Sequence, residues 1–307
     1  MPKAYVFTRN GGPETEALID VDRPEPGPEH LLVAVRAAGV NPVDYKIRNG
    51  YRRPGEDGGT FPAVFGGEVS GVVVETGESV TGFAAGQEVF GAPDSGGYAE
   101  FAVLPQSLAA HKPAALSFTD AATLPVAAAT AYDGVHQLGL APGATLLITG
   151  AGGGVGVAAT QIARAGGVRV IGLASEGKKD LLTSLGAVHV ASGPGWPERV
   201  RAAAPDGLDG IYDLVGGEVF AEAATLAGDG TPLISATVRP EEAERHGGAR
   251  VERARTAAVL EAVADLVVQG DLDPQVGARF PLERAGEALR EVESGHARGK
   301  VVIEVSE

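Results

Sequence analysis

The sequence predicts an α/β protein of two domains, an irregular all-β barrel followed by a doubly wound domain built on a parallel sheet. Residues 1–116 contain short β-like runs broken by glycine and proline. From residue 145 onward, strand-like and helix-like segments alternate instead. The chain of 307 residues is also long enough for two hydrophobic cores of ordinary size.

The first domain is expected to be a barrel because its strand-like runs are short and its turns are rich in glycine. The runs are residues 1–7, 31–35, 69–75, 88–90 and 98–104. Glycines recur at turn-like intervals, at positions 66, 67, 71, 77, 82, 86 and 91. Small barrels need such residues where the chain bends sharply and a side chain would clash.

The second domain is expected to begin with an alanine-rich helix over residues 117–138, with Asp120 or Thr119 as its N-cap. Strands and helices then alternate along the chain. The expected strands are 145–149, 168–173, 188–191, 211–215 and 232–236, and the expected helices are 155–165, 178–185, 197–204 and 218–226. Buried parallel strands joined by helices are typical of a doubly wound sheet.

The last part of the chain is expected to return to the first domain. Residues 237–255 are charged, show no clean period and are interpreted as a surface excursion. Amphipathic helices are expected over 256–268 and 282–292, followed by a closing strand over 300–305. The expected domains are therefore residues 1–119 with 272–307, and residues 120–271.

Composition excludes several classes of protein. No run of 18 apolar residues lacks a charge or a breaker, which argues against a membrane span. The net charge of −15 opposes binding to nucleic acid or to an anionic membrane. The absence of cysteine excludes disulfides, thiolate catalysis and every zinc site with sulfur ligands. The first residues lack the pattern of a signal peptide, so we expect a soluble, cytoplasmic protein.

A glycine-rich run that follows a strand and opens a helix is the strongest chemical signal. It reads Gly150-Ala151-Gly152-Gly153-Gly154-Val155-Gly156. Small residues in such a turn let backbone N–H groups and the helix N-terminus approach a pyrophosphate, and the last glycine allows close packing of helix on strand. The candidate cofactor-binding residues here are Gly150, Gly152, Gly153, Gly154 and Val155. A glycine-rich turn without a ligand is the alternative, and the continuing βαβ series disfavours it.

The end of the second strand of this domain favours NADPH over NADH. An acidic side chain there would bind the ribose hydroxyls of NAD and would repel a 2′-phosphate. The strand ends without a carboxylate, and Ser175 and Lys178 follow with a hydroxyl and a cation that suit a phosphate. Glu176 is the opposing observation, and a solvated surface role is the alternative for Lys178.

Six separate segments form a specific set across nearly the whole chain. They are residues 39–48 (GVNPVDYKIR), 65–73 (FGGEVSGVV), 86–91 (GQEVFG), Leu124-Pro125 with Thr130-Ala131-Tyr132, 213–217 (DLVGG) and 299–302 (GKVV). Together they resemble the zinc-independent medium-chain dehydrogenases/reductases, in particular the quinone oxidoreductases and alkenal/enone reductases. The resemblance implies a GroES-like barrel domain, a Rossmann domain that binds NADPH, and a homodimer formed through the edge of the nucleotide-domain sheet.

The resemblance also bears on metal binding. Zinc-dependent relatives place a cysteine at or beside Asn41 and a Gly-His-Glu triplet where this chain has Gly66-Gly67-Glu68. Both ligands are missing, and so is the cysteine-rich lobe that carries a second zinc. The six histidines are scattered without metal-ligand spacing. No metal site is therefore expected.

By resemblance, the catalytic candidates are in one segment. Asn41 is implied to lie beside the nicotinamide and the acceptor, with Asp44, Tyr45 and Lys46 close to the same cleft. Tyr45 could donate a hydrogen bond or a proton to an enolate, and Lys46 could stabilise that enolate. A structural role within the barrel is the alternative for Asp44 and Lys46.

Further cofactor contacts are also implied by the resemblance. Thr130 is expected to touch the cofactor, Val215 and Ser235 to lie along its nicotinamide half, and Lys300 to reach it from the closing strand. Relatives often place a tyrosine after the third strand of the nucleotide domain, near the 2′-phosphate. This chain has Ala191-Ser192-Gly193 there instead, so phosphate binding is expected to be weaker or rearranged.

The expected function is zinc-free transfer of a hydride from NADPH to an acceptor that activates itself, a quinone or an α,β-unsaturated carbonyl. One alternative is an enoyl or alkenal reductase proper, which the 41–46 segment slightly favours. Another is a non-catalytic NADPH-binding protein. The physiological substrate is not readable from the sequence.

Overall fold

The computed structural model describes residues 1–52, 60–295 and 297–305. Its contacts divide the chain into two units, residues 1–126, 255–268 and 274–307 in the first and residues 127–254 and 269–273 in the second. Compared with the expected domains, the first unit also includes residues 120–126 and 255–268. Residues 272 and 273 belong to the second unit instead of the first.

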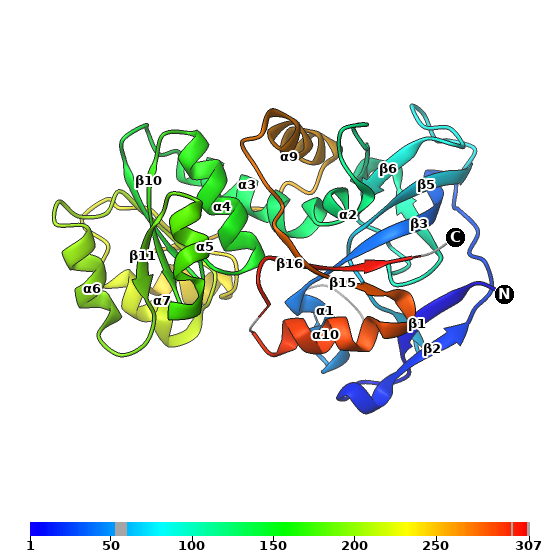
Figure 1. Cartoon of the computed structure of the whole chain (residues 1–307), viewed down its shortest axis with the longest axis horizontal. Coiled ribbons are helices and arrows are strands. Elements are labelled where there is room, and N and C mark those ends of the chain that lie inside the picture. The colour runs from blue at the N-terminus through cyan, green and yellow to red at the C-terminus, as the bar shows by residue number, and fades with distance from the viewer. Residues whose placement is uncertain (53–59, 296, 306–307) are drawn as a thin grey trace. The chain divides into compact units, whose positions relative to one another are not determined.

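The first unit is built on two β-sheets. The larger has the strand order β15-β16-β3-β5-β6-β8 with β7 paired to β3, and the smaller has the order β2-β1-β4. The strands are β1 (Lys3–Phe7), β2 (Glu16–Asp20), β3 (His30–Val40), β4 (Ala63–Val64), β5 (Val69–Thr76), β6 (Glu88–Gly91), β7 (Phe101–Pro105), β8 (Ala109–His111), β15 (Val276–Pro281) and β16 (Lys300–Glu304). As the sequence predicted, the last strand returns to the barrel, where red β16 pairs antiparallel with blue β3 (Figure 1).

The core of the first unit forms around β3, which pairs with β5, β7 and β16. Leu31, Val33 and Val35 alternate along β3 and are buried against Val69 and other apolar side chains of the barrel. Alternate residues of a strand point to the same face, so this spacing places one face of β3 inside the core.

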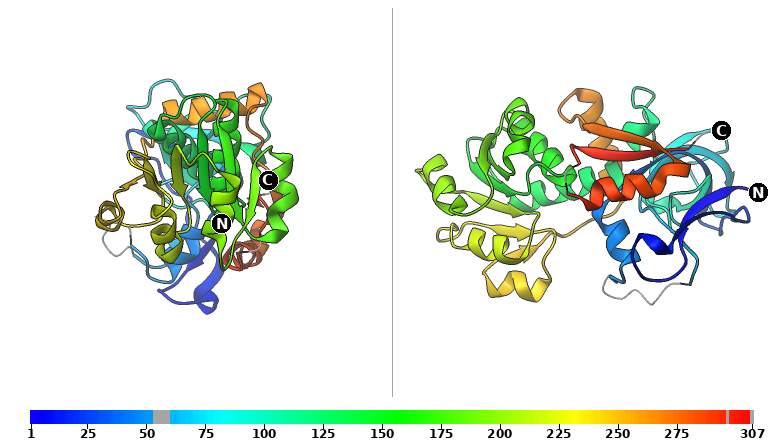
Figure 2. Two further views of the ribbon diagram at one scale, coloured as in Figure 1. Left: turned by 90° about the vertical axis from the view of Figure 1, so that its left-hand side faces the viewer. Right: turned by 60° about the horizontal axis from the view of Figure 1, so that its bottom comes forward.

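The α-helices of the first unit are short. They are α1 (Pro42–Arg48), α2 (Phe118–Ala121), α9 (Ala257–Gln269, whose last residue is grouped with the second unit) and α10 (Ala285–Glu293). Helix α10 lies along β15 and β16 (Figure 2, right), and its buried face carries Ala285, Ala288 and Leu289. These positions follow the helical period of three to four residues, as the amphipathic pattern predicted.

The second unit is a six-stranded parallel sheet with the order β11-β10-β9-β12-β13-β14. Its strands are β9 (Thr145–Thr149), β10 (Arg169–Ala174), β11 (Val188–Ala191), β12 (Gly210–Asp213), β13 (Leu233–Ser235) and β14 (Ala249–Arg250). Its α-helices are α3 (Ala129–Leu138), α4 (Gly154–Ala165), α5 (Lys179–Ser184), α6 (Trp196–Ala203), α7 (Gly217–Ala224) and α8 (Pro240–Arg245). The strand order reverses between β9 and β12, which is the position where doubly wound folds bind ligands.

The expected helix over 117–138 is wrong in its continuity and in its cap. The segment contains α2, a π-helical turn over Leu124–Ala128 and then α3. Pro125 lies inside the turn and lacks an N–H donor, so regular α-helical hydrogen bonding cannot run through it. The N-cap is Ser117, whose Oγ accepts a hydrogen bond from the N–H of Asp120 at 3.0 Å, and not Thr119 or Asp120 itself.

The surface excursion expected over residues 237–255 also contains regular structure, for which no pattern was predicted. The segment contains α8, which begins at Pro240, and β14, which pairs parallel with β13 as the sixth strand of the sheet. A strand of two residues is too short to show a period of two, which explains why no pattern was visible. The strands β2, β4, β8 and β15 were not among the predicted ones either.

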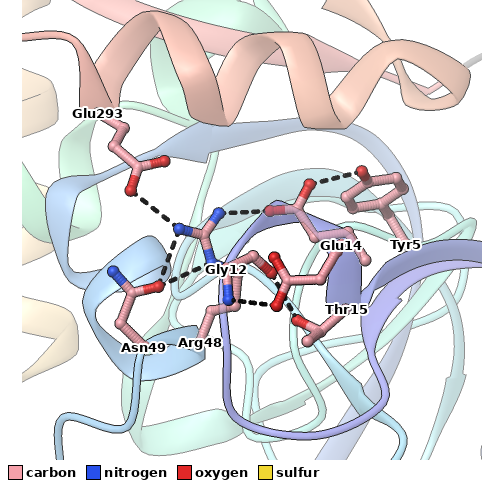
Figure 3. Close-up of polar contacts among 8 residues, drawn as sticks. Tyr5, Gly12, Glu14, Thr15, Arg48, Asn49 and Glu293 are labelled. Carbon is pink, nitrogen blue, oxygen red and sulfur yellow. Dashed lines mark hydrogen bonds and ion pairs between the residues drawn. The ribbon is translucent and has the colours of Figure 1, made fainter.

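A buried arginine anchors helix α1 to the barrel. Arg48 ends α1 with only 1% of its side chain exposed, and its guanidinium contacts Glu16 on β2 at 2.5 Å and Glu293 on α10 at 2.9 Å. Asn49 also accepts hydrogen bonds from Arg48, and Tyr5 donates through its hydroxyl to Glu16. In Figure 3 the guanidinium of Arg48 contacts Asn49, Glu293 and the carboxylate that also accepts from the hydroxyl of Tyr5. This cluster joins three elements that are far apart in the sequence.

The variant Arg48→Met is expected to lower the free energy of unfolding by about 3–5 kcal/mol, because Glu16 would remain buried as an uncompensated charge. The double variant Arg48→Met/Glu16→Gln removes that charge and is expected to recover part of the loss. Urea unfolding measures both. Arg23→Met is a matched control, since Arg23 and its partner Glu75 are about half exposed, and it is expected to change stability little. A loss no greater than that of the control would contradict the assignment.

Candidate cofactor site and buried polar network

The glycine run forms a tight loop between β9 and α4. Gly150 has a φ of +65°, a conformation that favours glycine. A Cβ atom on Gly156 would lie 2.5 Å from the Cα of Ala151, so only glycine lets the first turn of α4 pack this closely on the loop. The N–H groups of that first turn lack intrahelical acceptors, and the helix N-terminus attracts anions. These features suit a pyrophosphate, and the role of Gly150, Gly152, Gly153, Gly154 and Val155 in binding one stays a prediction.

The structure brings Lys178 to the glycine loop. A Cβ atom on Gly152 would lie 2.7 Å from the Cγ of Lys178, so the aliphatic part of this lysine lies directly over Gly152. Ser175 is exposed at the end of β10, three residues before Lys178. Glu176, which opposed binding of a phosphate, is solvent-exposed and forms an ion pair with Lys179 at 3.8 Å. The aliphatic part of Lys178 therefore packs on the loop, whereas the carboxylate of Glu176 pairs with Lys179.

A buried aspartate holds together the ends of three strands at the point where the strand order reverses. Asp213 ends β12 and is fully buried. Its Oδ1 accepts from the hydroxyl of Thr149 on β9 at 2.6 Å, and its Oδ2 accepts from the hydroxyl of Ser235 on β13 at 2.6 Å. The N–H groups of Val215 and Gly216 also donate to Asp213. The carboxylate thereby fixes the loop after β12.

The other residues implied for cofactor binding lie in different surroundings. Val215 is 49% exposed, and one of its methyl groups lies 3.1 Å from the position of a Cβ on Gly150. The hydroxyl of Ser235 donates to Asp213 and accepts from the N–H of Thr237 at 3.1 Å, so its hydrogen bonds are made within the protein. Thr130 is buried on α3, where its carbonyl accepts from the hydroxyl of Tyr212 at 2.8 Å.

In the first unit, three buried polar side chains form one network. Lys300, at the start of β16, donates to Oδ1 of Asn41 and to Oε1 of Glu68, each at 2.7 Å. The Nδ2 of Asn41 donates to the same Glu68 oxygen at 2.7 Å. The other oxygen of Glu68 accepts from the N–H of Val126 at 2.8 Å. The network therefore joins Lys300, which was expected at the cofactor, to Asn41, the first catalytic candidate.

Asp44 completes this region from inside α1. Its Oδ2 accepts hydrogen bonds from the N–H of Asn41 and from the hydroxyl of Tyr98, both at 2.8 Å. The pKa of the Asp44 carboxyl is raised to about 6, mainly by burial and also by the nearby charge of Glu68, whereas these two donors and the charge of Lys300 act against the rise. Burial also raises the pKa of Tyr98 well above its ordinary value, so Tyr98 remains a donor.

The four catalytic candidates at the start of α1 therefore differ in burial and in contacts. Asn41 and Asp44 belong to the buried network, whereas Tyr45 is partly buried and Lys46 is exposed. Asp44 and Arg48 are four residues apart and share the buried face of the helix, which turns Tyr45 to another side. Burial raises the pKa of the Tyr45 hydroxyl, and the charge of Glu293 acts in the same direction.

Three residues of these networks had no assigned role from the sequence. Glu68 and Asp213 lie in segments that were quoted for the resemblance, and each is a single acid beside a buried apolar strand. That position is a usable signal, because a carboxylate at a strand end is seldom buried without partners. Tyr98 offered no comparable signal, because its partner Asp44 lies 54 residues away along the chain.

The described part of the chain offers neither a cluster of metal-ligating side chains nor a membrane-spanning helix. Among these residues, no group of three or more histidine, cysteine, aspartate or glutamate side chains is placed to hold a metal ion. Within the same part, none of the helices is both long and apolar enough to cross a membrane.

Comparisons with known proteins agree over nearly the whole chain. Residues 27–114 match the family model described as alcohol dehydrogenase GroES-like domain, and residues 185–303 match the one described as zinc-binding dehydrogenase. The 2-methylene-furan-3-one reductase of Solanum lycopersicum is 32% identical over 315 residues, covering 98% of this chain and 78% of that protein. The chloroplastic NADPH-dependent alkenal/one oxidoreductase of Arabidopsis thaliana is 30% identical over 317 residues, with coverage of 98% and 79%. The structure of the quinone oxidoreductase from Coxiella burnetii superposes with a TM-score of 0.88 at 28% identity, covering 99% of both chains.

The buried Asp44 predicts a pH dependence of stability. Its pKa is raised from 3.8 to about 6 on folding, so the folded protein retains a proton that the unfolded chain releases, and stability falls as pH rises through this window. Between pH 4 and 7, the free energy of unfolding of wild type is expected to fall by about 3 kcal/mol more than that of Asp44→Asn. This figure takes roughly 1.4 kcal/mol for each unit of the pKa shift. An asparagine can keep both hydrogen bonds because they share one oxygen.

Urea unfolding at a series of pH values measures this difference, and Asp20→Asn, at an exposed position, is the matched control. The free energy of unfolding of the control is expected to change with pH as that of wild type does. If the free energy of unfolding of Asp44→Asn showed the same pH dependence as wild type, the raised pKa assigned to Asp44 would be wrong.

Proposed function

Since this chain belongs to the medium-chain dehydrogenases/reductases, with quinone oxidoreductases and alkenal/one oxidoreductases as relatives, we propose that it is an NADPH-dependent, zinc-independent reductase. Its proposed acceptors are quinones and α,β-unsaturated carbonyls. Membership in this family makes the chain an NAD(P)H-dependent oxidoreductase. The choice of NADPH, the independence of zinc, the acceptor class and a homodimer are parts of the proposal.

The observation that carries the proposal is the network of Lys300, Asn41 and Glu68. Zinc-dependent relatives are expected to have a metal ligand at or beside position 41, and here Asn41 is hydrogen-bonded to both an ammonium and a carboxylate. Lys300 already neutralises Glu68 with a fixed positive charge at 2.7 Å. An ammonium in the middle of the donor set disfavours a divalent cation at the same place. Asn41 is therefore suited to hydrogen bonding and not to ligating zinc.

The residues of the second unit fit a dinucleotide. The loop of Gly150, Gly152 and Gly153, with the N-terminus of α4, would hold the pyrophosphate. Lys178, which lies over Gly152, and Ser175 at the end of β10 would hold a 2′-phosphate. Exposed Glu176, which forms an ion pair with Lys179 at 3.8 Å, is a negative charge at this strand end and opposes a 2′-phosphate.

When bound, NADPH would supply a hydride to the electron-poor carbon of the acceptor. The chain itself must hold the acceptor oxygen, on which negative charge develops. Asn41 can do so as a hydrogen-bond donor. Tyr45 stays protonated because burial raises the pKa of its hydroxyl, so it can supply the proton that an enolate requires. The side chain of Lys46 is exposed to solvent and can stabilise the negative charge that develops on the acceptor.

Replacement of Lys178 tests the choice of cofactor. Lys178→Ala is expected to raise the dissociation constant of NADPH by about 10-fold or more, because one charge-assisted contact to the 2′-phosphate is lost. The dissociation constant of NADH should stay nearly unchanged. Fluorescence titration of both cofactors measures this, and Lys179→Ala is the matched control because Lys179 is exposed next to Lys178. A wild type that binds NADH as tightly as NADPH would overturn the cofactor assignment.

A panel of acceptors tests the reaction. With NADPH, wild type is expected to reduce at least one class among simple quinones and α,β-unsaturated ketones and aldehydes, followed by the absorbance of NADPH. Product analysis separates the two classes, since a quinone yields a hydroquinone or semiquinone and an enone yields a saturated ketone. Tight binding of NADPH with no turnover across the panel would contradict the proposed reaction and favour a non-catalytic NADPH-binding protein.

A further inference from the structure

We propose that Lys300 and Glu68 act as positioning residues, which fix the side-chain amide of Asn41 so that its one remaining N–H points to the carbonyl oxygen of the acceptor. This inference rests on the proposed function for the identity of the ligand. It also changes the role that the resemblance implied for Lys300, from a contact with the cofactor to a contact with Asn41.

The donors of Lys300 are all used within the protein. An ammonium group has three N–H bonds and no acceptor. Its Nζ lies within hydrogen-bond distance of three oxygens, at 2.7 Å from Asn41, 2.7 Å from Glu68 and 3.3 Å from the carbonyl of Val40. Lys300 is also buried, with 5% of its surface exposed. No N–H of Lys300 is left for a cofactor.

The same partners permit only one orientation of the Asn41 amide. Lys300 can only donate, so the atom that faces it must be the oxygen Oδ1. The carboxylate of Glu68 can only accept, so the atom that faces it must be the nitrogen Nδ2. A rotation of the amide by 180° would place like groups against each other at both positions, and each buried group would lose its partner. The assignment therefore follows from the chemistry of the neighbours.

One donor of the cluster remains. Nδ2 carries two hydrogens, and one of them is donated to Glu68 at 2.7 Å. The backbone N–H of Asn41 is donated to Asp44. The second hydrogen of Nδ2 has no acceptor among the residues that the structure describes, although Asn41 is only 4% exposed. A nearly buried donor of fixed direction is suited to bind an oxygen that gains negative charge.

The local backbone is adapted to this arrangement. A Cβ atom on Gly39 would lie 2.1 Å from Oε1 of Glu68 and 2.5 Å from the carbonyl of Ala122. Any other residue at this position would displace Glu68 from its partners. The β3 strand therefore approaches the carboxylate as closely as glycine allows, two residues before Asn41.

The orientation can be tested without turnover. The chain contains only three asparagines, at positions 10, 41 and 49, so selective ¹⁵N-asparagine labelling gives three side-chain amide signals, and Asn41→Ala identifies one of them. In wild type, the two Nδ2 protons of Asn41 are expected to differ widely in chemical shift, because one is bonded to a carboxylate. In Lys300→Met this difference is expected to narrow as the amide becomes free to turn, while Asn10 and Asn49 serve as internal controls. Unchanged Asn41 signals in Lys300→Met would overturn the proposal.

Lys300→Met leaves Glu68 buried without its cation and can fail to fold. The charge-neutral variant Lys300→Met/Glu68→Gln covers that case, and it is expected to show the same narrowing. Retention of the wild-type separation in this variant would equally overturn the proposal.

A kinetic cycle tests the consequence for the reaction. Asn41→Ala and Lys300→Met, or its charge-neutral form, are each expected to lower kcat/KM for the acceptor by up to about 100-fold. The combined variant is expected to be no worse than Asn41→Ala, because Lys300 acts only through Asn41. Losses that multiply, or a dissociation constant for NADPH that rises when Lys300 is replaced, would show that Lys300 acts directly. An inactive wild type would instead refute the proposed function, and the spectra would still decide the orientation.

Discussion

The carboxylate of Glu68, fully removed from solvent, is the constraint on which the arrangement of the first unit depends. A buried charge costs several kcal/mol unless it is paired and hydrogen-bonded. Here Lys300, Asn41 and the N–H of Val126 supply those partners. They come from the last strand, from the start of α1 and from the segment that leads to the second unit, so three distant parts of the sequence must meet to satisfy one side chain.

Helix α1 is also held in a defined position by buried polar side chains that require partners. A helix of seven residues has little stability of its own. At its first turn, Asp44 accepts from Asn41 and from Tyr98, and at its last residue, Arg48 pairs with Glu16 and Glu293. Because both ends are held by buried polar contacts, the direction of the Asn41 side chain is set by the barrel. Tyr45 lies between these anchors, takes no part in them and is partly buried.

The architecture could be predicted from the sequence, because alternation and the glycine loop are local patterns. The β9-loop-α4 unit, the parallel strands and the return of β16 to the barrel follow from such patterns. Errors occurred where a local pattern is absent or competes with another. The two-residue strand β14 is too short for a period, and Pro125 interrupts what alanine content alone suggests is one helix.

The candidate site could be predicted only in part, because its chemistry depends on contacts across the sequence. Asn41 and Asp44 were identified through a resemblance, but their partners Glu68, Tyr98 and Lys300 lie 27, 54 and 259 residues away from them. No spacing rule connects such positions. The hydrogen bonds of Lys300 could not be predicted for the same reason, since a lysine at the start of a strand reveals nothing about the three oxygens around it.

Turnover by metal-depleted protein shows whether hydrogen bonding by a fixed amide replaces a metal in this family member. The protein would be treated with a chelator, its zinc content determined by elemental analysis, and its reduction of an enone or quinone by NADPH then measured. We expect full activity at negligible zinc content, with no gain when zinc is added back. Activity that disappears with the chelator and returns in proportion to bound zinc would contradict it.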